Sequence, residues 1–203
     1  MEISAHSREL ARDLLNFIDA SPSPWHAVQT TAGRLLHAGF VALREDERWQ
    51  LVAGGRYFVI RGGASIVAFV MGQDKLDRCG FRLVGAHTDS PGLRVKPKAL
   101  QVADGLLQVG VEVYGGPILA TFADRDLSLA GRVAVRHGDG IAMRLVHFAE
   151  PLLRLPNLAI HMNREVNENG LKFNKQTELP LLLGFGEDGA GDDGLFRTLL
   201  VKQ

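Results

Sequence analysis

The spacing of the apolar residues changes near residue 98, and this change limits the chain to a fold with two different parts. Before it, apolar residues recur at the helical period in two segments, 7–20 and Ser23 to about Gly39. After it, apolar and polar residues alternate, most regularly over 107–114, which is the period of a half-buried strand. We therefore expect an α/β fold whose later part is rich in β-structure.

Three local patterns in the first part predict elements and their ends. Ser23 is a suitable N-cap for a helix that begins at Pro24. Proline is favourable at the first helical position, because the amide hydrogen that it lacks would have no partner within the helix there. The runs Tyr57–Ile60 and Ser65–Val70 flank two glycines, which predicts a β-hairpin. The short apolar run Phe81–Ala86 predicts a buried strand that ends at His87-Thr88-Asp89.

Charge and cysteine content exclude several classes of function. Lys+Arg and Asp+Glu both number 23, so nothing in the charge balance favours nucleic acid or an anionic membrane as a partner. The single cysteine, Cys79, cannot form an internal disulfide and has no obvious base beside it, so we expect it to be inert. The first ten residues do not resemble a secretory signal, and no apolar run approaches the roughly 20 residues of a membrane helix. We expect a cytoplasmic protein.

His87 and Asp89 form the strongest local signal for chemistry. Ligands gather outside the carboxyl ends of strands in open α/β sheets, and a neutral imidazole is a common zinc ligand. A carboxylate two residues later can orient that imidazole or a metal-bound water. By itself the pattern leaves two interpretations open, a metal ligand or a strand-end histidine that meets a neighbouring carboxylate.

Other polar residues are weaker candidates. In a predicted strand over Leu158–Met162, His161 faces away from the packed side, which indicates solvent, a cleft or a partner subunit. Taken alone it is a surface or interface histidine. For Asp124-Arg125-Asp126 we favour salt bridges at the entrance of a strand over a metal site. His26 is expected to pack or to help cap its helix.

Five motifs occur in one order along the chain, and together they resemble the aspartyl aminopeptidase family. One such match could arise by chance, whereas five in the same order indicate the family. The resemblance covers the N-terminal half of that family's sequence and runs from near residue 20 to near residue 180. The motifs are Ser23-Pro24-Trp25-His26-Ala27, the segment 85–91 around His87, Val113-Tyr114-Gly115-Gly116, the segment from Asp124 to Val133, and Pro156 to His161.

The resemblance implies a two-zinc exopeptidase that removes N-terminal Asp or Glu from peptides by activating water. His87 falls on a zinc-ligand position, and Asp89 on the acidic position that helps to set up the site. His161 falls on a histidine of an inserted β-rich dimerisation domain, which reaches a neighbouring subunit's active site to contact substrate or zinc. The implied fold is an α/β catalytic domain, represented by residues 1–97, interrupted by the dimerisation domain, residues 98–203. The subunits of such enzymes assemble into large homo-oligomers.

The resemblance also implies that most of the metal site lies outside this sequence. The family's remaining ligands and its catalytic glutamate belong to the second half of the catalytic domain, which has no counterpart in the 203 residues. A catalytic zinc takes about three protein ligands, so His87 alone cannot hold two ions. We expect the chain to be inactive by itself. The alternative is a non-catalytic interaction or oligomerisation fragment of such an enzyme.

Overall fold

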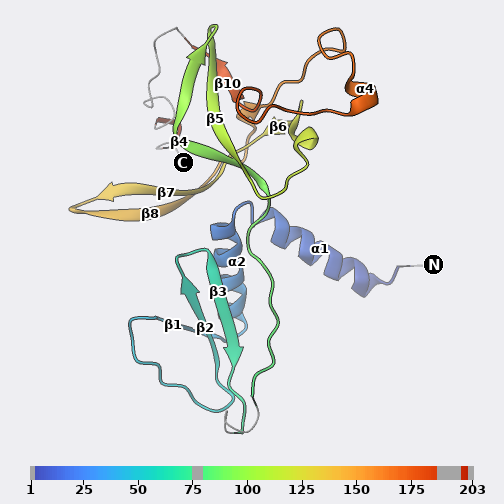
Figure 1. Cartoon of the computed structure of the whole chain (residues 1–203). Helices are drawn as coiled ribbons and strands as arrows, with labels where there is room; N and C mark the ends of the chain where they lie inside the picture. The colour runs from blue at the N-terminus through green and yellow to red at the C-terminus, as the bar shows by residue number, and fades with distance from the viewer. Residues whose placement is uncertain (1–2, 75–79, 187–197, 201–203) are drawn as a thin grey trace. The chain divides into compact units, whose positions relative to one another are not determined.

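The computed structural model describes residues 3–74, 80–186 and 198–200. The chain divides into two compact units (Figure 1). Unit 1 contains Met1–Asp89 together with Gly131–Leu145, and unit 2 contains Ser90–Ala130 together with Val146–Gln203. The segment Gly131–Leu145, from the middle of the chain, therefore belongs to the same unit as the N-terminal residues. The predicted domain boundary after residue 97 refers to the complete protein and stays a prediction.

Unit 1 begins with two helices, α1 (Ala5–Asp19) and α2 (Pro24–His37), as the sequence predicts. The Ser23 side chain caps α2 by accepting a hydrogen bond from the His26 amide, and Pro24 occupies the first turn. After the helix, the amides of Gly39 and Phe40 donate 3.0 Å hydrogen bonds to the carbonyls of Leu36 and Leu35. These two bonds are those of a Schellman motif, so α2 ends at the glycine that was expected to stop it.

The apolar faces of the two helices differ in burial. Val28 of α2 is 2% exposed, and Ala27 is also buried. The apolar stripe of α1 is present as predicted, but its four residues are each more than half exposed: Leu10, Leu14, Leu15 and Ile18. An ion pair between Arg34 and Asp13, with Nη1 2.8 Å from Oδ2, links the helices on their polar side. The stripe of α1 is therefore an apolar surface that the described part of unit 1 leaves uncovered.

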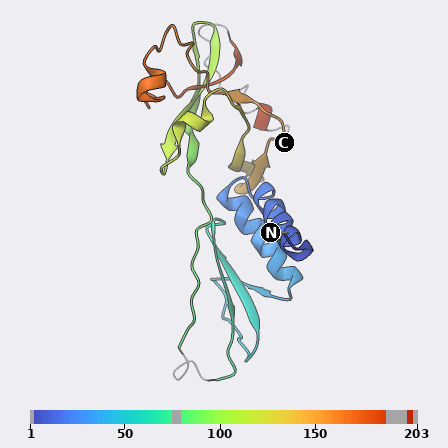
Figure 2. The ribbon, with the colours of Figure 1, turned by 90° about the vertical axis from the view of Figure 1, so that its right-hand side faces the viewer.

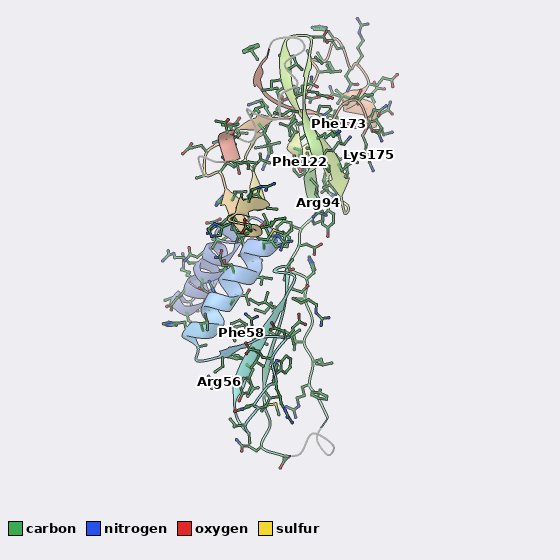
Figure 3. The ribbon with its side chains drawn as sticks, turned by 90° about the vertical axis from the view of Figure 1, so that its left-hand side faces the viewer. Arg56, Phe58, Arg94, Phe122, Phe173 and Lys175 are labelled. Atoms are coloured by element: carbon green, nitrogen blue, oxygen red, sulfur yellow. The ribbon has the colours of Figure 1, made fainter. Side chains whose placement is uncertain are left out.

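The sheet of unit 1 has three strands, β1 (Val41–Leu43), β2 (Arg56–Arg61) and β3 (Ser65–Val70), in the order β1-β2-β3. The first pair is parallel, and β2 and β3 form the antiparallel hairpin that the sequence predicts. Tyr57 of β2 lies 5.6 Å from Phe69 of β3 between ring centroids. The next residue, Phe58, labelled in Figure 3, points to the opposite face and is also buried. Helix α2 contacts all three strands and covers the sheet on one side.

The segment Phe81–Ala86 does not form the buried strand that the sequence predicts. It is extended but unpaired, which Figure 2 shows as a trace without an arrow, and Leu83 and Val84 are 89% and 101% exposed. A strand buried on both faces needs a hydrogen-bonded neighbour and a covering layer. Within the described residues no strand pairs with this segment, so its apolar side chains have nothing to pack against.

Unit 2 is built on a five-stranded sheet in the order β4-β5-β10-β9-β6, and every pair in it is antiparallel. The long strands β4 (Gly92–Ala103) and β5 (Leu106–Tyr114) form its largest pair. The other elements are η1 (Leu119–Phe122), β6 (Asp126–Leu127), β9 (Leu153–Arg154), α4 (Val166–Asn169) and β10 (Leu181–Phe185). The remaining strands, β7 (Ala130–His137) and β8 (Gly140–His147), pair as a separate hairpin, and residues 131–145 of this hairpin belong to unit 1.

The core of unit 2 follows the alternation seen in the sequence. Leu107, Val109 and Val111 of β5 are at most 5% exposed, so the prediction of a half-buried strand is confirmed. Val109 and Val111 pack with Leu155, Leu179 and Leu181 from later in the chain, and the partly buried Phe122 and Phe173, both labelled in Figure 3, contact the same cluster. Burying one such aliphatic side chain stabilises a fold by about 1.5–3 kcal/mol.

The mixed helix and sheet content confirms the expected α/β fold class with a β-rich later part. Among the described residues, no helix has the length and apolar character needed to cross a bilayer. The expectation that Cys79 is inert lies outside the described residues.

Candidate metal centre

His87 and Asp89 lie together in unit 1, at the end of the extended segment. The His87 Nδ1 atom is 2.8 Å from the Asp89 backbone oxygen and 3.2 Å from its carboxylate Oδ1. A backbone carbonyl can only accept, so Nδ1 donates to it, and Nε2 becomes the ring nitrogen that can bind a metal. The His87 side chain is 81% exposed. This is the arrangement in which an oxygen partner fixes the tautomer of a histidine ligand.

Thr88, between these two residues, fastens them to the β2–β3 hairpin. Its hydroxyl donates a 2.7 Å hydrogen bond to the carbonyl of Ala64, the last residue of the hairpin turn. Thr88 is part-buried, whereas the residues that precede it in the segment are exposed. The contact spans 24 residues of sequence, and neither periodicity nor motif spacing indicated it. The sequence analysis therefore missed Thr88 as a residue that places the site.

His161 does not lie on a strand, so that part of the prediction is wrong. It is in a turn, in which the amides of Met162 and Asn163 donate to the Ala159 carbonyl at 2.8 and 3.2 Å. Just before this turn, the Asn157 side chain accepts a 2.9 Å hydrogen bond from the Leu158 amide, which a paired strand would use in its ladder. His161 is exposed in unit 2, and its expected contact with substrate or zinc stays a prediction.

The acidic pair Asp124 and Asp126 is structural, as expected. Arg154 pairs with Asp126 at 2.9 Å and donates a second 2.9 Å hydrogen bond to the backbone carbonyl of Asp124. The Asp124 carboxylate accepts a hydrogen bond from the Asn157 amide at 3.2 Å. The sequence suggested a salt bridge because Arg125 lies between the two carboxylates. In the structure, Asp126 forms its salt bridge with Arg154 of β9. These contacts join the entrance of β6 to β9.

His26 takes the capping role that was expected for it. Its Nδ1 atom lies 2.7 Å from the Ser23 hydroxyl, which also receives the His26 amide hydrogen. Ser23 is the buried polar residue at the start of α2, with 8% of its surface exposed. The Ser23-Pro24-Trp25-His26 motif is therefore a helix-start structure in unit 1.

The residues present fit one ligand position of a zinc site. Within residues 3–74, 80–186 and 198–200, no three His, Cys, Asp or Glu side chains converge. A catalytic zinc takes about three protein ligands, of which His87 with its oxygen partner suits one.

Comparison with known protein families assigns the chain. The family model described as aminopeptidase I zinc metalloprotease (M18) matches residues 17–194. The chain belongs to the M18 family of zinc metalloproteases. This match takes in every motif on which the sequence resemblance rested and confirms it.

Relatives of the M18 family are similar over nearly the whole chain. A probable M18 family aminopeptidase 2 of Pseudomonas fluorescens is 50% identical over 196 residues, which is 96% of this chain and 45% of that protein. The corresponding protein of Azotobacter vinelandii is 48% identical over the same shares of the two chains. The chain thus spans less than half the length of these curated M18 relatives.

Solved structures support the same fold. The cryo-EM structure of the Ape4 and Nbr1 complex matches with a TM-score of 0.86 at 43% identity, covering 95% of this chain and 38% of that one. The structure of Chaetomium thermophilum mApe1 matches with a TM-score of 0.82 at 31% identity, covering 95% of this chain and 46% of that one. An M18 aminopeptidase from Thermotoga maritima, at 23% identity and a TM-score of 0.76, shares the fold.

Proposed function

We propose that this chain supplies the N-terminal part of a zinc aminopeptidase that removes acidic residues, Asp or Glu, from the N-terminus of peptides. The observation that carries the proposal is the His87 ring, held through Nδ1 by Asp89 within a chain that matches the M18 family. This geometry supports a metal ligand because it directs Nε2 outward and fixes the tautomer. The acidic specificity rests on the sequence resemblance.

Each site residue has a distinct proposed role. His87 would hold one of two zinc ions through Nε2, and Asp89 would keep the imidazole in that orientation. His161, exposed on unit 2, would contact substrate, or a zinc ion, of a neighbouring subunit. Zinc, when bound, supplies Lewis-acid polarisation of the scissile carbonyl and activates the attacking water.

The location and assembly of the protein are part of the same proposal. One structural neighbour, mApe1 of S. cerevisiae, is described as a dodecamer, and it shares the fold at 24% identity and a TM-score of 0.68. We propose that the complete enzyme self-associates into a large homo-oligomer through its β-rich domain and acts in the cytoplasm. Peptides with an acidic first residue would be its substrates.

The chain by itself is proposed to have no peptidase activity, because its described residues bring together no group of three candidate ligands, and a catalytic zinc needs about three. A second candidate follows from the same observation. A polypeptide of this length with exposed apolar segments, such as the one around Leu83, would serve as a non-catalytic fragment that associates with complete subunits.

The test compares the 203-residue chain with a longer protein that continues it to the length of the M18 relatives. Both are assayed with added zinc on peptides that differ only in their first residue, Asp, Glu or Leu. We expect turnover of the acidic peptides by the longer protein and none by the short chain. His87→Ala in the longer protein should abolish turnover and lower its zinc content, whereas His137→Ala, a change of an exposed histidine on β7, is the matched control.

Three results would contradict the proposal. Robust turnover by the short chain would show that the metal site does not need further ligands. Equal loss in the His87 and His137 variants would remove the assigned role of His87. A longer protein that prefers the Leu peptide would refute the acidic specificity alone.

A further inference from the structure

The turn that joins β2 to β3 makes hydrogen bonds on two sides. It consists of Arg61 to Ala64, closed by a 3.3 Å hydrogen bond from the Ala64 amide to the Arg61 carbonyl. Its central residues Gly62 and Gly63 have φ values of 59° and 74°, which only glycine adopts at little cost. This tight turn leaves the carbonyls of Gly62 and Ala64 to accept hydrogen bonds from side chains elsewhere in unit 1.

Arg132 of β7 holds the turn from one side. Its Nη1 donates a 2.7 Å hydrogen bond to the Gly62 carbonyl, across 70 residues of sequence. Its guanidinium also lies over the Trp25 ring, with Cζ 5.1 Å from the ring centroid, a cation–π geometry. The β7–β8 hairpin, the start of α2 and the β2–β3 turn lie together in Figures 1 and 2. Arg132 thus connects three elements that are distant in sequence.

The fit between these groups is close. A Cβ atom added at Gly63 would lie 3.1 Å from Arg132 Nη1 and 3.6 Å from Trp25 Cδ1. The turn therefore packs directly against the guanidinium and the indole. A planar guanidinium can satisfy a carbonyl and stack on a ring at the same time, which fixes the position of the turn more firmly than a hydrogen bond alone.

The His87 segment holds the same turn from the other side. Thr88 donates its 2.7 Å hydrogen bond to Ala64, two residues after the carbonyl that Arg132 uses. The described residues before Thr88 in this segment form no strand and are exposed, so this bond joins the segment to the β2–β3 turn. A group that holds the turn in place therefore also acts on His87 and Asp89, the two neighbours of Thr88.

We propose that Arg132 is a positioning residue for the His87–Asp89 segment, acting through the β2–β3 turn and Thr88. Its meaning for catalysis rests on the proposed function, but the positioning itself does not. Arg132 bonds the Gly62 carbonyl, in the same turn whose Ala64 carbonyl accepts the Thr88 hydroxyl. By holding the turn, Arg132 sets the location of the Ala64 carbonyl, to which Thr88 is hydrogen-bonded.

The test measures backbone order in the isotopically labelled 203-residue chain by NMR relaxation, without zinc or substrate. In the unmodified chain the Thr88 amide should have an order parameter of about 0.8, near that of rigid backbone. Arg132→Ala should lower it below about 0.6, the range of flexible backbone. Arg132→Lys, which keeps a donor and a cation over Trp25, should restore part of the order.

Two controls separate positioning from general damage. Arg136→Ala removes another exposed arginine from β7 and should leave Thr88 as ordered as before. The amides of Tyr57 and Val59 in the β2–β3 ladder report whether the sheet is intact. If Arg132→Ala lost that ladder, Arg132→Gln, which keeps a polar side chain, would take its place in the comparison.

An unchanged order parameter at Thr88 in Arg132→Ala would overturn the proposal, and so would an equal fall in Arg136→Ala. Because these measurements need neither metal nor turnover, they are independent of the peptidase assay. In the longer protein the same Arg132→Ala change should reduce kcat and zinc content together. Loss of activity without loss of Thr88 order would refute the positioning role and leave the peptidase assignment intact.

Discussion

Thr88 donates its hydroxyl hydrogen to the carbonyl of Ala64 over 2.7 Å, so the residue between His87 and Asp89 is fastened to a hairpin turn formed much earlier in the chain. The candidate ligand segment has no strand pairing of its own among the described residues. The Thr88 side chain connects this segment to the β2–β3 hairpin.

Replacing Thr88 by valine should loosen the segment. Valine keeps the shape and removes the donor, which should lower the free energy of unfolding by about 0.5–1.5 kcal/mol. Thr88→Ser retains the hydroxyl and is the matched control. Urea denaturation gives the stability, and NMR relaxation of residues 87–89 gives the local order. Equal order in the Val and Ser variants would show that the hydrogen bond does not hold the segment.

Two glycine substitutions should act in opposite directions. Gly63→Ala places a Cβ 3.1 Å from Arg132 Nη1 at a residue with a φ of 74°, so we expect a loss of about 1–2 kcal/mol. Gly33→Ala lies inside α2 with nothing within 4 Å of the added carbon, and it should stabilise the chain by up to about 1 kcal/mol. Thermal denaturation of both variants measures the difference. A Gly63 variant as stable as the unmodified chain would contradict the close packing.

The core of unit 2 should be sensitive to truncation at Leu155. This residue is 0% exposed within the apolar cluster, so Leu155→Ala should cost about 2–5 kcal/mol through lost burial and a cavity. Leu158→Ala, at a position that is 52% exposed, should change stability by less than about 0.5 kcal/mol. Denaturant unfolding followed by NMR of β5 amides checks both. Comparable losses at the two positions would contradict the described core.

The apolar segment around Leu83 should respond differently in the short and the longer protein. In the 203-residue chain Leu83 is 89% exposed, so Leu83→Asp should alter stability by less than about 0.5 kcal/mol. We predict that the additional polypeptide of a relative-length protein covers this segment. The same change would then bury an uncompensated charge and cost about 3 kcal/mol or more. Denaturation of both proteins measures whether the segment around Leu83 is covered in the longer one. The control is Ile141→Asp, at a residue of β8 that is 75% exposed.

One pH effect should appear far from the candidate ligands, at Asp46. Its hydrogen bond from Arg44 lowers the pKa of this carboxyl below its ordinary value. A lowered folded-state pKa means that the pair stabilises the fold above the unfolded pKa of about 3.9 and that this contribution is lost as pH falls through the folded value. The midpoint of an NMR titration of the Asp46 carboxyl carbon should move to higher pH in the Arg44→Gln variant. An unmoved midpoint would show that Arg44 is not the cause.

The sequence by itself determined the local elements, because their causes are local. Ser23 and Pro24 start α2, the glycines after Arg61 allow the hairpin, and alternation from Leu107 predicts β5. The five ordered motifs also determined the family, since motif order does not depend on three-dimensional contacts. His87 and Asp89 were found as a pair because they are separated by one residue.

Only the tertiary structure decided which surfaces are buried and what holds the candidate ligands. An apolar run such as Phe81–Ala86 predicts a buried strand, but burial requires a neighbouring strand, and no described strand pairs with it. His161 lies in a turn closed by hydrogen bonds to the Ala159 carbonyl, although the alternating pattern predicted a strand there. The contacts of Arg132 and Thr88 with one turn bridge 70 and 24 residues, and long-range contacts of this kind are set by how the elements pack.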